Sequence, residues 1–308
     1  MKRFLTLLLC VVLLTGCAAP RAAGEGYTFT DDTGAEVTVA VKPQKVAVLL
    51  SSLADLWITA GGSVDISVGE SVERGFADAS VILVDEGAGK TINLEALIAA
   101  QPDFVLYSSD LSGQLECAEI LHTAGIPAAG FAVETFADYL RVLKICTDIL
   151  ETPEHYEKYG TSLKTEIDAM IAAAQAQEDQ PTILFVRAGS SAKVTKAKTA
   201  ENHFVCAMLK ELGTLNIAEK APILLDGLST EEILLSDPDH ILFTTMGDEA
   251  AGAGYMQSLI DDPVWQTLTA VKSGSVHQLP KELFQYKPNA RWGEAYAYLI
   301  ELLYGDIL

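Results

Sequence analysis

The sequence of 308 residues predicts an α/β protein of two lobes, each with a mainly parallel sheet, joined by one long helix. Three observations lead to this prediction. Strand-like and helix-like segments alternate along the chain, an internal repeat places the same motif in each half, and a long amphipathic segment separates the two copies. Alternating strands and helices are typical of parallel sheets with helical crossovers.

The first half begins with a predicted hairpin over residues 27–41, whose two arms flank an Asp-Thr-Gly turn. Residues 46–50 form a continuous aliphatic run, as expected of a parallel strand buried on both faces. A helix is expected from about residue 53 to residue 60, because Gly61 and Gly62 are typical of a helix end.

The repeat is the most informative feature of the chain. Residues 93–107 and 229–243 align without a gap at a separation of 136 residues. Each copy reads as a short helix capped by Asn93 or Ser229, a Pro-Asp break and a buried strand. Two similar units this far apart indicate two lobes of one architecture, and not a solenoid.

Between the copies, helical spacing of apolar residues predicts one helix over residues 136–150 and a second that Thr152 caps and Pro153 begins. The second helix is expected to span about 36 Å at about 1.5 Å per residue, enough to bridge two lobes stiffly. The expected organisation is listed from the N-terminus: signal peptide 1–17, tether 18–26, N-terminal lobe 27–152, bridging helix 153–178 and C-terminal lobe 179–308.

The N-terminus has a basic start, an apolar run over residues 4–14, and small residues before Cys17. This order is typical of a secretory signal, and the run is too short to cross a bilayer. The sequence Leu14-Thr15-Gly16-Cys17 resembles the lipobox of bacterial lipoproteins, which implies a lipid on Cys17 and an anchor on the outer face of the cell membrane. The alternative is an ordinary signal peptide in which Cys17 has no role.

Charge and cysteine content exclude several classes of protein. The chain has 21 Lys and Arg against 42 Asp and Glu, a net charge of −21, which argues against a nucleic-acid partner. Cys117, Cys146 and Cys206 are widely spaced and form no zinc motif, so we expect buried free thiols, with one disulfide as the alternative.

The run 46–50 with Ser51 and Ser52, the two repeat copies and the bridging helix together resemble the ABC-importer binding proteins for ferric siderophores, haem and cobalamin. The resemblance implies two Rossmann-like lobes with a ligand cleft between them. It also implies a monomer that is not an enzyme, holds no cofactor or metal of its own, and delivers a small metal chelate to a permease dimer. The function expected is delivery of a ferric siderophore or haem, with cobalamin or another corrinoid as the alternative.

The family docks on its permease through one surface glutamate on each lobe, and Glu95 and Glu231 match those positions. Each also falls in the first turn of a short helix, where a carboxylate favours the helix dipole. A role confined to the helix dipole is therefore the alternative to docking.

Ligands of open α/β sheets bind beyond the carboxyl ends of the strands, and the loops there hold the candidate residues. We expect Arg187 and Arg291 to bind acidic groups and aromatic side chains to cover flat apolar surface. Tyr286 and Met246 are candidate haem ligands, and the alternative for Trp292 is packing within the last helix. The ligand-binding candidates are Ser51, Ser52, Trp57, Tyr107, Arg187, Ser190, Met246, Tyr286, Arg291 and Trp292.

Two other functions are alternatives to chelate binding. A secreted enzyme on the same scaffold would need a nucleophile beside a base, and no such motif occurs in the sequence. A manganese or zinc binder would need histidines and carboxylates converging in the cleft, whose loops hold mostly serine, arginine and aromatic residues. The segment 87–91 resembles a phosphate loop but lacks its first glycine, so we expect a surface loop.

Overall fold

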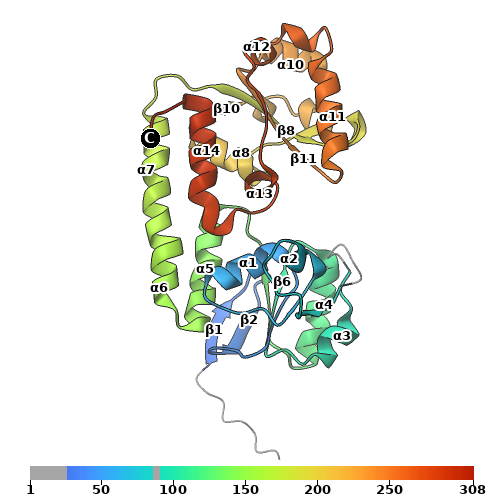
Figure 1. Ribbon diagram of the computed structural model, residues 1–308, viewed down its shortest axis with the longest axis vertical. Coiled ribbons are helices and arrows are strands. Elements are labelled where there is room, and N and C mark those ends of the chain that lie inside the picture. The colour runs from blue at the N-terminus through green and yellow to red at the C-terminus, as the bar shows by residue number, and fades with distance from the viewer. Residues whose placement is uncertain (1–25, 86–90) are drawn as a thin grey trace, which may run out of the picture.

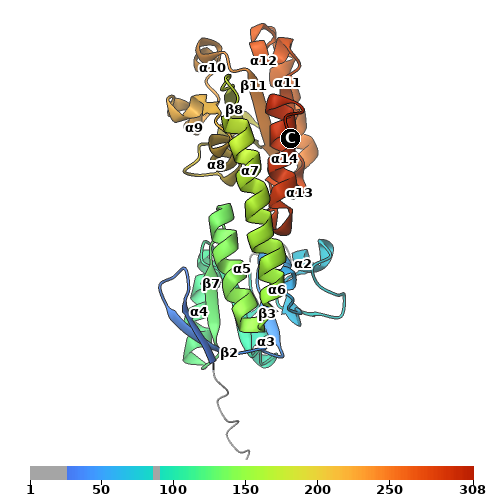
Figure 2. The same cartoon turned by 90° about the vertical axis from the view of Figure 1, so that its left-hand side faces the viewer.

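The computed structural model describes residues 26–85 and 91–308, which form two α/β lobes with a long helix beside them (Figure 1). Turned by 90°, the same helix passes in front of both lobes (Figure 2). Cys17 and most of the segment 87–91 lie outside the described residues. Within the described ranges, no helix is both long enough and apolar enough to cross a membrane.

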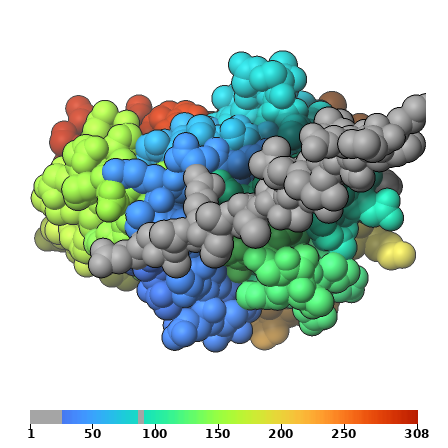
Figure 3. Space-filling view, turned by 90° about the horizontal axis from the view of Figure 1, so that it is seen from below, coloured from blue at the N-terminus to red at the C-terminus, as the bar shows by residue number. Residues whose placement is uncertain are grey.

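The N-terminal lobe opens with the predicted hairpin, in which β1 (Gly26–Thr30) pairs antiparallel with β2 (Glu36–Ala40). The view from below shows the blue surface of the first residues at this end of the molecule (Figure 3). A sheet of five parallel strands follows in the order β5-β4-β3-β6-β7. These strands are β3 (Val46–Val48), β4 (Ile66–Ser67), β5 (Ile82–Leu83), β6 (Phe104–Ser108) and β7 (Ala128–Phe131).

Helices pack against this sheet, and the longest presents an apolar face to it. In the longest, Thr135 and Asp138 form a capping box at the N-terminus, and Tyr139, Val142 and Cys146 lie on the buried face. The helices are α1 (Ser51–Thr59), α2 (Gly69–Glu73), α3 (Leu94–Ala99), α4 (Ser112–Thr123) and α5 (Phe136–Leu150).

The C-terminal lobe repeats the parallel sheet, with the order β10-β8-β11-β12 and β9 added antiparallel to β8. The strands are β8 (Thr182–Ala188), β9 (Lys196–Ala197), β10 (Leu215–Asn216), β11 (His240–Thr245) and β12 (Val276–Gln278). In both lobes the strand order reverses beside the first strand of the sheet, which is where doubly wound folds bind ligands.

The C-terminal lobe has more helices than the N-terminal lobe, and many of them are short. Those of four or more residues are α8 (Phe204–Glu211), α9 (Ile223–Asp226), α10 (Thr230–Ser236), α11 (Glu249–Ile260), α12 (Thr269–Lys272), α13 (Lys281–Phe284) and α14 (Trp292–Tyr304). Single 3₁₀ turns are η2 (Ala192–Val194), η3 (Ile217–Glu219), η4 (Trp265–Thr267) and η5 (Asn289–Arg291).

The internal repeat has a structural basis. Gln101 and Asp237 both adopt positive φ, at 51° and 38°, and this left-handed residue ends the short helix before the proline. The next aspartate then ties the repeat to its own sheet, since a carboxylate oxygen of Asp103 accepts from the Lys45 N–H at 3.0 Å. The equivalent oxygen of Asp239 accepts from the Thr182 N–H at 2.8 Å. Asn93 and Ser229 cap their helices as the sequence predicts.

The helix between the lobes runs without a break through α6 (Pro153–Tyr156), a π-helical turn η1 (Glu157–Ser162) and α7 (Leu163–Gln175). Pro153 occupies its first turn, but Thr152 does not cap it, because the Thr152 hydroxyl donates to the Ala60 carbonyl at 2.7 Å. At about 1.5 Å per residue the segment spans about 34 Å. One apolar cluster extends from Phe104 through Ile167 to Phe185, so the helix shares a core with both lobes.

Candidate functional site

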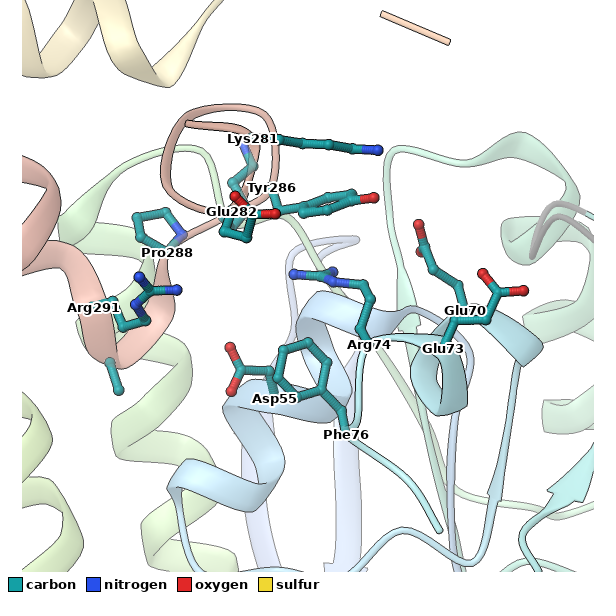
Figure 4. A pocket seen from close by; sticks show the side chains of 12 residues that line it. Asp55, Glu70, Glu73, Arg74, Phe76, Lys281, Glu282, Tyr286, Pro288 and Arg291 are labelled. Atoms are coloured by element: carbon teal, nitrogen blue, oxygen red, sulfur yellow. The ribbon is translucent and has the colours of Figure 1, made fainter. Parts of the chain in front are cut away.

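A cavity of about 510 Å³ lies between the lobes (Figure 4). Its lower wall comes from α1, α2 and the residues that follow α2, while its upper wall comes from α13 and the segment leading to α14. Four cationic side chains and four carboxylates are among its lining residues: Arg74, Lys281, Lys287 and Arg291 against Asp55, Glu70, Glu73 and Glu282. The cavity is therefore close to neutral, although the chain as a whole carries a net charge of −21.

Arg74 is the central side chain of this cavity. Its guanidinium carbon lies 3.8 Å from the centre of the Tyr286 ring and 4.8 Å from that of Phe76. Arg74 Nη1 donates to the Ser51 hydroxyl at 2.8 Å, and that hydroxyl donates to a Glu70 carboxylate oxygen at 2.6 Å. Burial lowers the pKa of Arg74, but a guanidinium stays charged in proteins. Arg74 thus connects the N-terminal lobe to Tyr286 on the other wall.

Asn289 makes a second connection between the walls. Its side-chain amide donates to the Ser52 carbonyl and to an Asp55 carboxylate oxygen, both at 2.8 Å. Asn289 is fully buried and has a positive φ of 49°, a conformation that asparagine tolerates better than most residues. Burial raises the pKa of Asp55, while the bond from Asn289 opposes that rise.

A second cavity between the lobes, of about 310 Å³, has a different character. It is lined by Glu134, Arg187, Asn202, His203, Phe204, Gln285 and Lys287. Lys287 Nζ lies 2.8 Å from a Glu134 carboxylate oxygen and 4.5 Å from the centre of the Phe204 ring. Burial, together with the charges of Lys287 and Arg187, lowers the pKa of His203 to about 3, so this imidazole is neutral at ordinary pH. Lys287 belongs to both cavities.

Several predicted binding residues meet at these cavities. Tyr286 and Arg291 line the larger one, Ser51 supports its Arg74, and Ser52 contributes a carbonyl to the Asn289 bridge. Arg291 is half-exposed and pairs with Glu294 at 2.7 Å. Arg187, the residue before the last one of β8, lines the smaller cavity.

Three aromatic side chains predicted to bind ligand lie in the core and do not line these cavities. Trp57 is 1% exposed and its indole N–H donates to the Ser63 carbonyl at 2.9 Å, since α1 turns this face toward the sheet. Tyr107 is 3% exposed and packs on Gly130, where an added Cβ would come within 2.7 Å of the ring. Trp292, on the last helix, is fully buried between Phe136 and Phe204, which agrees with the alternative interpretation that it packs in the core.

Ser190 and Met246 line neither of these two cavities. Ser190 is exposed in the loop after β8, and Met246 is half-buried with its backbone N–H bound to the Ala188 carbonyl. A third cavity, of about 390 Å³, lies within the C-terminal lobe near Cys206 and Lys210. None of the predicted ligand-binding residues lines it.

Sequence reasoning missed Arg74, Glu134 and Lys287. Arg74 ends α2, a helix of five residues that follows the two-residue strand β4, and elements this short leave no periodic pattern in the sequence. Lys287 stands in the segment 284–292, whose density of aromatic and cationic residues is visible in the sequence. Glu134 follows β7 and precedes the capping residue Thr135, so its position after a strand is the signal that predicts a place in the cleft.

The remaining polar predictions concern the surface and the cysteines. Glu95 on α3 and Glu231 on α10 are both exposed, in equivalent first turns of the two lobes. Cys117, Cys146 and Cys206 are free and buried. No group of three or more histidine, cysteine or acidic residues that could hold a metal ion occurs among residues 26–85 and 91–308.

Two doubly wound lobes, a shared helix and cavities between the lobes define a two-lobed binding protein. A family model described as periplasmic binding protein matches residues 46–283. The chain therefore belongs to the periplasmic binding protein family, as its resemblance predicts, and membership implies a location outside the cytoplasm. No curated protein is similar enough in sequence to be a detectable relative.

Solved structures of low sequence identity share the fold. A periplasmic solute binding protein from Veillonella parvula is 20% identical, with a TM-score of 0.72 over 92% of this chain and 88% of that one. The periplasmic heme-binding protein RhuT from Roseiflexus is 18% identical, with a TM-score of 0.68 over 84% and 97%. Staphylococcus aureus SirA, solved with staphyloferrin B, is 17% identical, with a TM-score of 0.69 over 90% and 98%.

Proposed function

We propose that this protein is an extracytoplasmic, lipid-anchored binding protein that delivers a ferric siderophore or haem to an ABC importer. The observation that carries the proposal is the cavity of about 510 Å³ between the lobes, with Arg74 stacked on Tyr286. Stacked cationic and aromatic groups suit a ligand with both flat and acidic parts. Structural relatives named for haem binding and for staphyloferrin B support the same ligand class.

Delivery to the permease is assigned to Glu95 and Glu231. Both carboxylates are exposed, and each stands in the first turn of a capped helix on its own lobe. One such group on each lobe suits a permease made of two equivalent subunits. The membrane anchor is assigned to the lipid expected on Cys17.

Tyr286 separates the two ligand classes. Its ring lies against Arg74 on the upper wall, and a phenolate is a known type of iron ligand in haem proteins. If the solute is haem, Tyr286→Phe shifts the absorbance of the bound haem and weakens binding. If the solute is a ferric siderophore, which brings its own iron ligands, the same change leaves the iron absorbance unaltered.

The test is a titration of the mature protein with haemin and with a panel of ferric siderophores, in which tryptophan fluorescence reports binding. We expect at least one of these compounds to bind at micromolar concentration or below and to be recovered chemically unchanged. Binding of a corrinoid alone would favour the alternative ligand. Turnover of a chelate to a new compound would favour an enzyme, and binding of none would contradict the proposal.

A further inference from the structure

Cationic side chains gather around the smaller cavity in an arrangement that costs the folded protein stability. Arg187 on β8 stands directly opposite Lys196 on the antiparallel strand β9. Like charges at directly opposite positions destabilise a strand pair. Lys198 follows two residues after Lys196, and its pKa is lowered by burial and by the charge of Arg187. Lys287 approaches from the segment before α14. Four cations thus share one small region of an acidic protein.

Arg187, His203 and Lys287 present hydrogen-bond donors around this cavity, and the Gln285 Oε1 acceptor is buried there without a partner among the described residues. Arg187 Nε is buried and has no hydrogen-bond partner among the described residues. The His203 ring accepts from the Val205 N–H through Nδ1 at 3.3 Å, which leaves the proton of the neutral imidazole on Nε2. Guanidinium, ammonium and imidazole N–H groups together match the acceptor oxygens of an anion.

Glu134 provides the one carboxylate among the described residues that line the cavity. It comes from the opposite lobe, between β7 and α5, and reaches Lys287 across the gap. Its side chain is 56% exposed, whereas that of Lys287 is 20% exposed. The carboxylate therefore sits at the rim of the cavity, where water can solvate it once it leaves the more buried Lys287.

We propose that the smaller cavity binds a carboxylate group of the solute, and that Glu134 is a built-in competitor which this group displaces from Lys287. The inference rests on the proposed function as a solute-binding protein. When the solute carboxylate replaces Glu134, Lys287 keeps an anionic partner, so the free-energy cost of the exchange is small. The solute carboxylate also pairs with Arg187, which Glu134 does not. Binding then requires an acidic group on the solute and releases one contact between the lobes.

The test uses citrate as the probe, measured by isothermal titration calorimetry at low ionic strength on the mature protein and four variants. Glu134→Gln removes the competitor and is expected to tighten citrate binding about tenfold. Lys287→Gln is expected to weaken it about tenfold, and Glu134→Gln added to Lys287→Gln is expected to have no further effect. Glu151→Gln is the matched control, because Glu151 pairs with Lys42, is also 56% exposed, and lies away from both cavities.

Unchanged or weaker citrate binding by the Glu134→Gln variant would overturn the inference, as would equal tightening in Glu151→Gln. The absence of citrate binding to Glu134→Gln would overturn it too. The proposed function fails separately, if neither haemin nor any ferric siderophore binds the wild-type protein. Siderophore binding that Glu134→Gln and Lys287→Gln leave unaltered would refute the inference while the proposed function stands.

Discussion

Replacing Arg74 with Met and Tyr286 with Leu, singly and together, measures how strongly the two lobes are coupled across the larger cavity. The guanidinium lies 3.8 Å from the ring centre and both side chains are half-buried. Cation–π pairs contribute about 0.5–1 kcal/mol when exposed and about 2 kcal/mol when desolvated, so we expect a coupling of about 1–2 kcal/mol. Arg74→Met alone also removes the bond to the Ser51 hydroxyl, a further loss of about 1.5–3 kcal/mol.

The measurement is the free energy of unfolding in urea. The fluorescence of three buried tryptophans, Trp57, Trp265 and Trp292, reports the unfolding. Lys158 and Tyr159 on the long helix form a control pair, because Lys158 Nζ lies 4.6 Å from that ring centre and is exposed. Their coupling is expected to stay below about 1 kcal/mol. Additive effects of the Arg74 and Tyr286 changes, within about 0.5 kcal/mol, would refute the claim that this stack joins the lobes.

Three further predictions concern docking, pH and anchoring. Reversing Glu95 and Glu231 to Lys should abolish uptake in cells while solute affinity changes less than about threefold, or under about 1 kcal/mol; loss of affinity would contradict docking. Burial lowers the pKa of His203 to about 3 in the folded protein, whereas a histidine in the unfolded chain has a pKa of about 6.5. Between these values the unfolded state binds more protons, so stability should fall as the pH drops from about 6.5 toward 3. His203→Phe should reduce this loss by about 1 kcal/mol per pH unit, whereas the exposed His122→Gln should not; identical pH profiles would refute the assignment. Cys17→Ala should release the protein from membrane fractions or leave its signal uncut, and unaltered fractionation would exclude the lipid anchor.

Much of the architecture follows from local sequence rules. The hairpin, the capped repeat helices and the bounds of α5 all agree with prediction, because capping residues and apolar periodicity act over a few positions. The repeat reaches further, since Asp103 and Asp239 make the same contact with the start of a sheet in each lobe.

The candidate site was harder to predict, because position along a strand does not fix the direction of a side chain. Tyr107 lies near the end of β6 and Trp57 lies on α1, yet both side chains point into the core. Arg74 ends the short helix α2 and Glu134 follows β7, and only the packing of one lobe against the other brings them to Tyr286 and Lys287. Contacts between lobes depend on the fold as a whole.

A crystal structure of the protein with the compound that remains bound when it is purified from its own host tests the central claim most directly. We expect an iron chelate between the lobes, in contact with Arg74 and Tyr286 in the larger cavity and with Arg187 in the smaller one. A compound bound instead in the third cavity, near Lys210 within the C-terminal lobe, would contradict it.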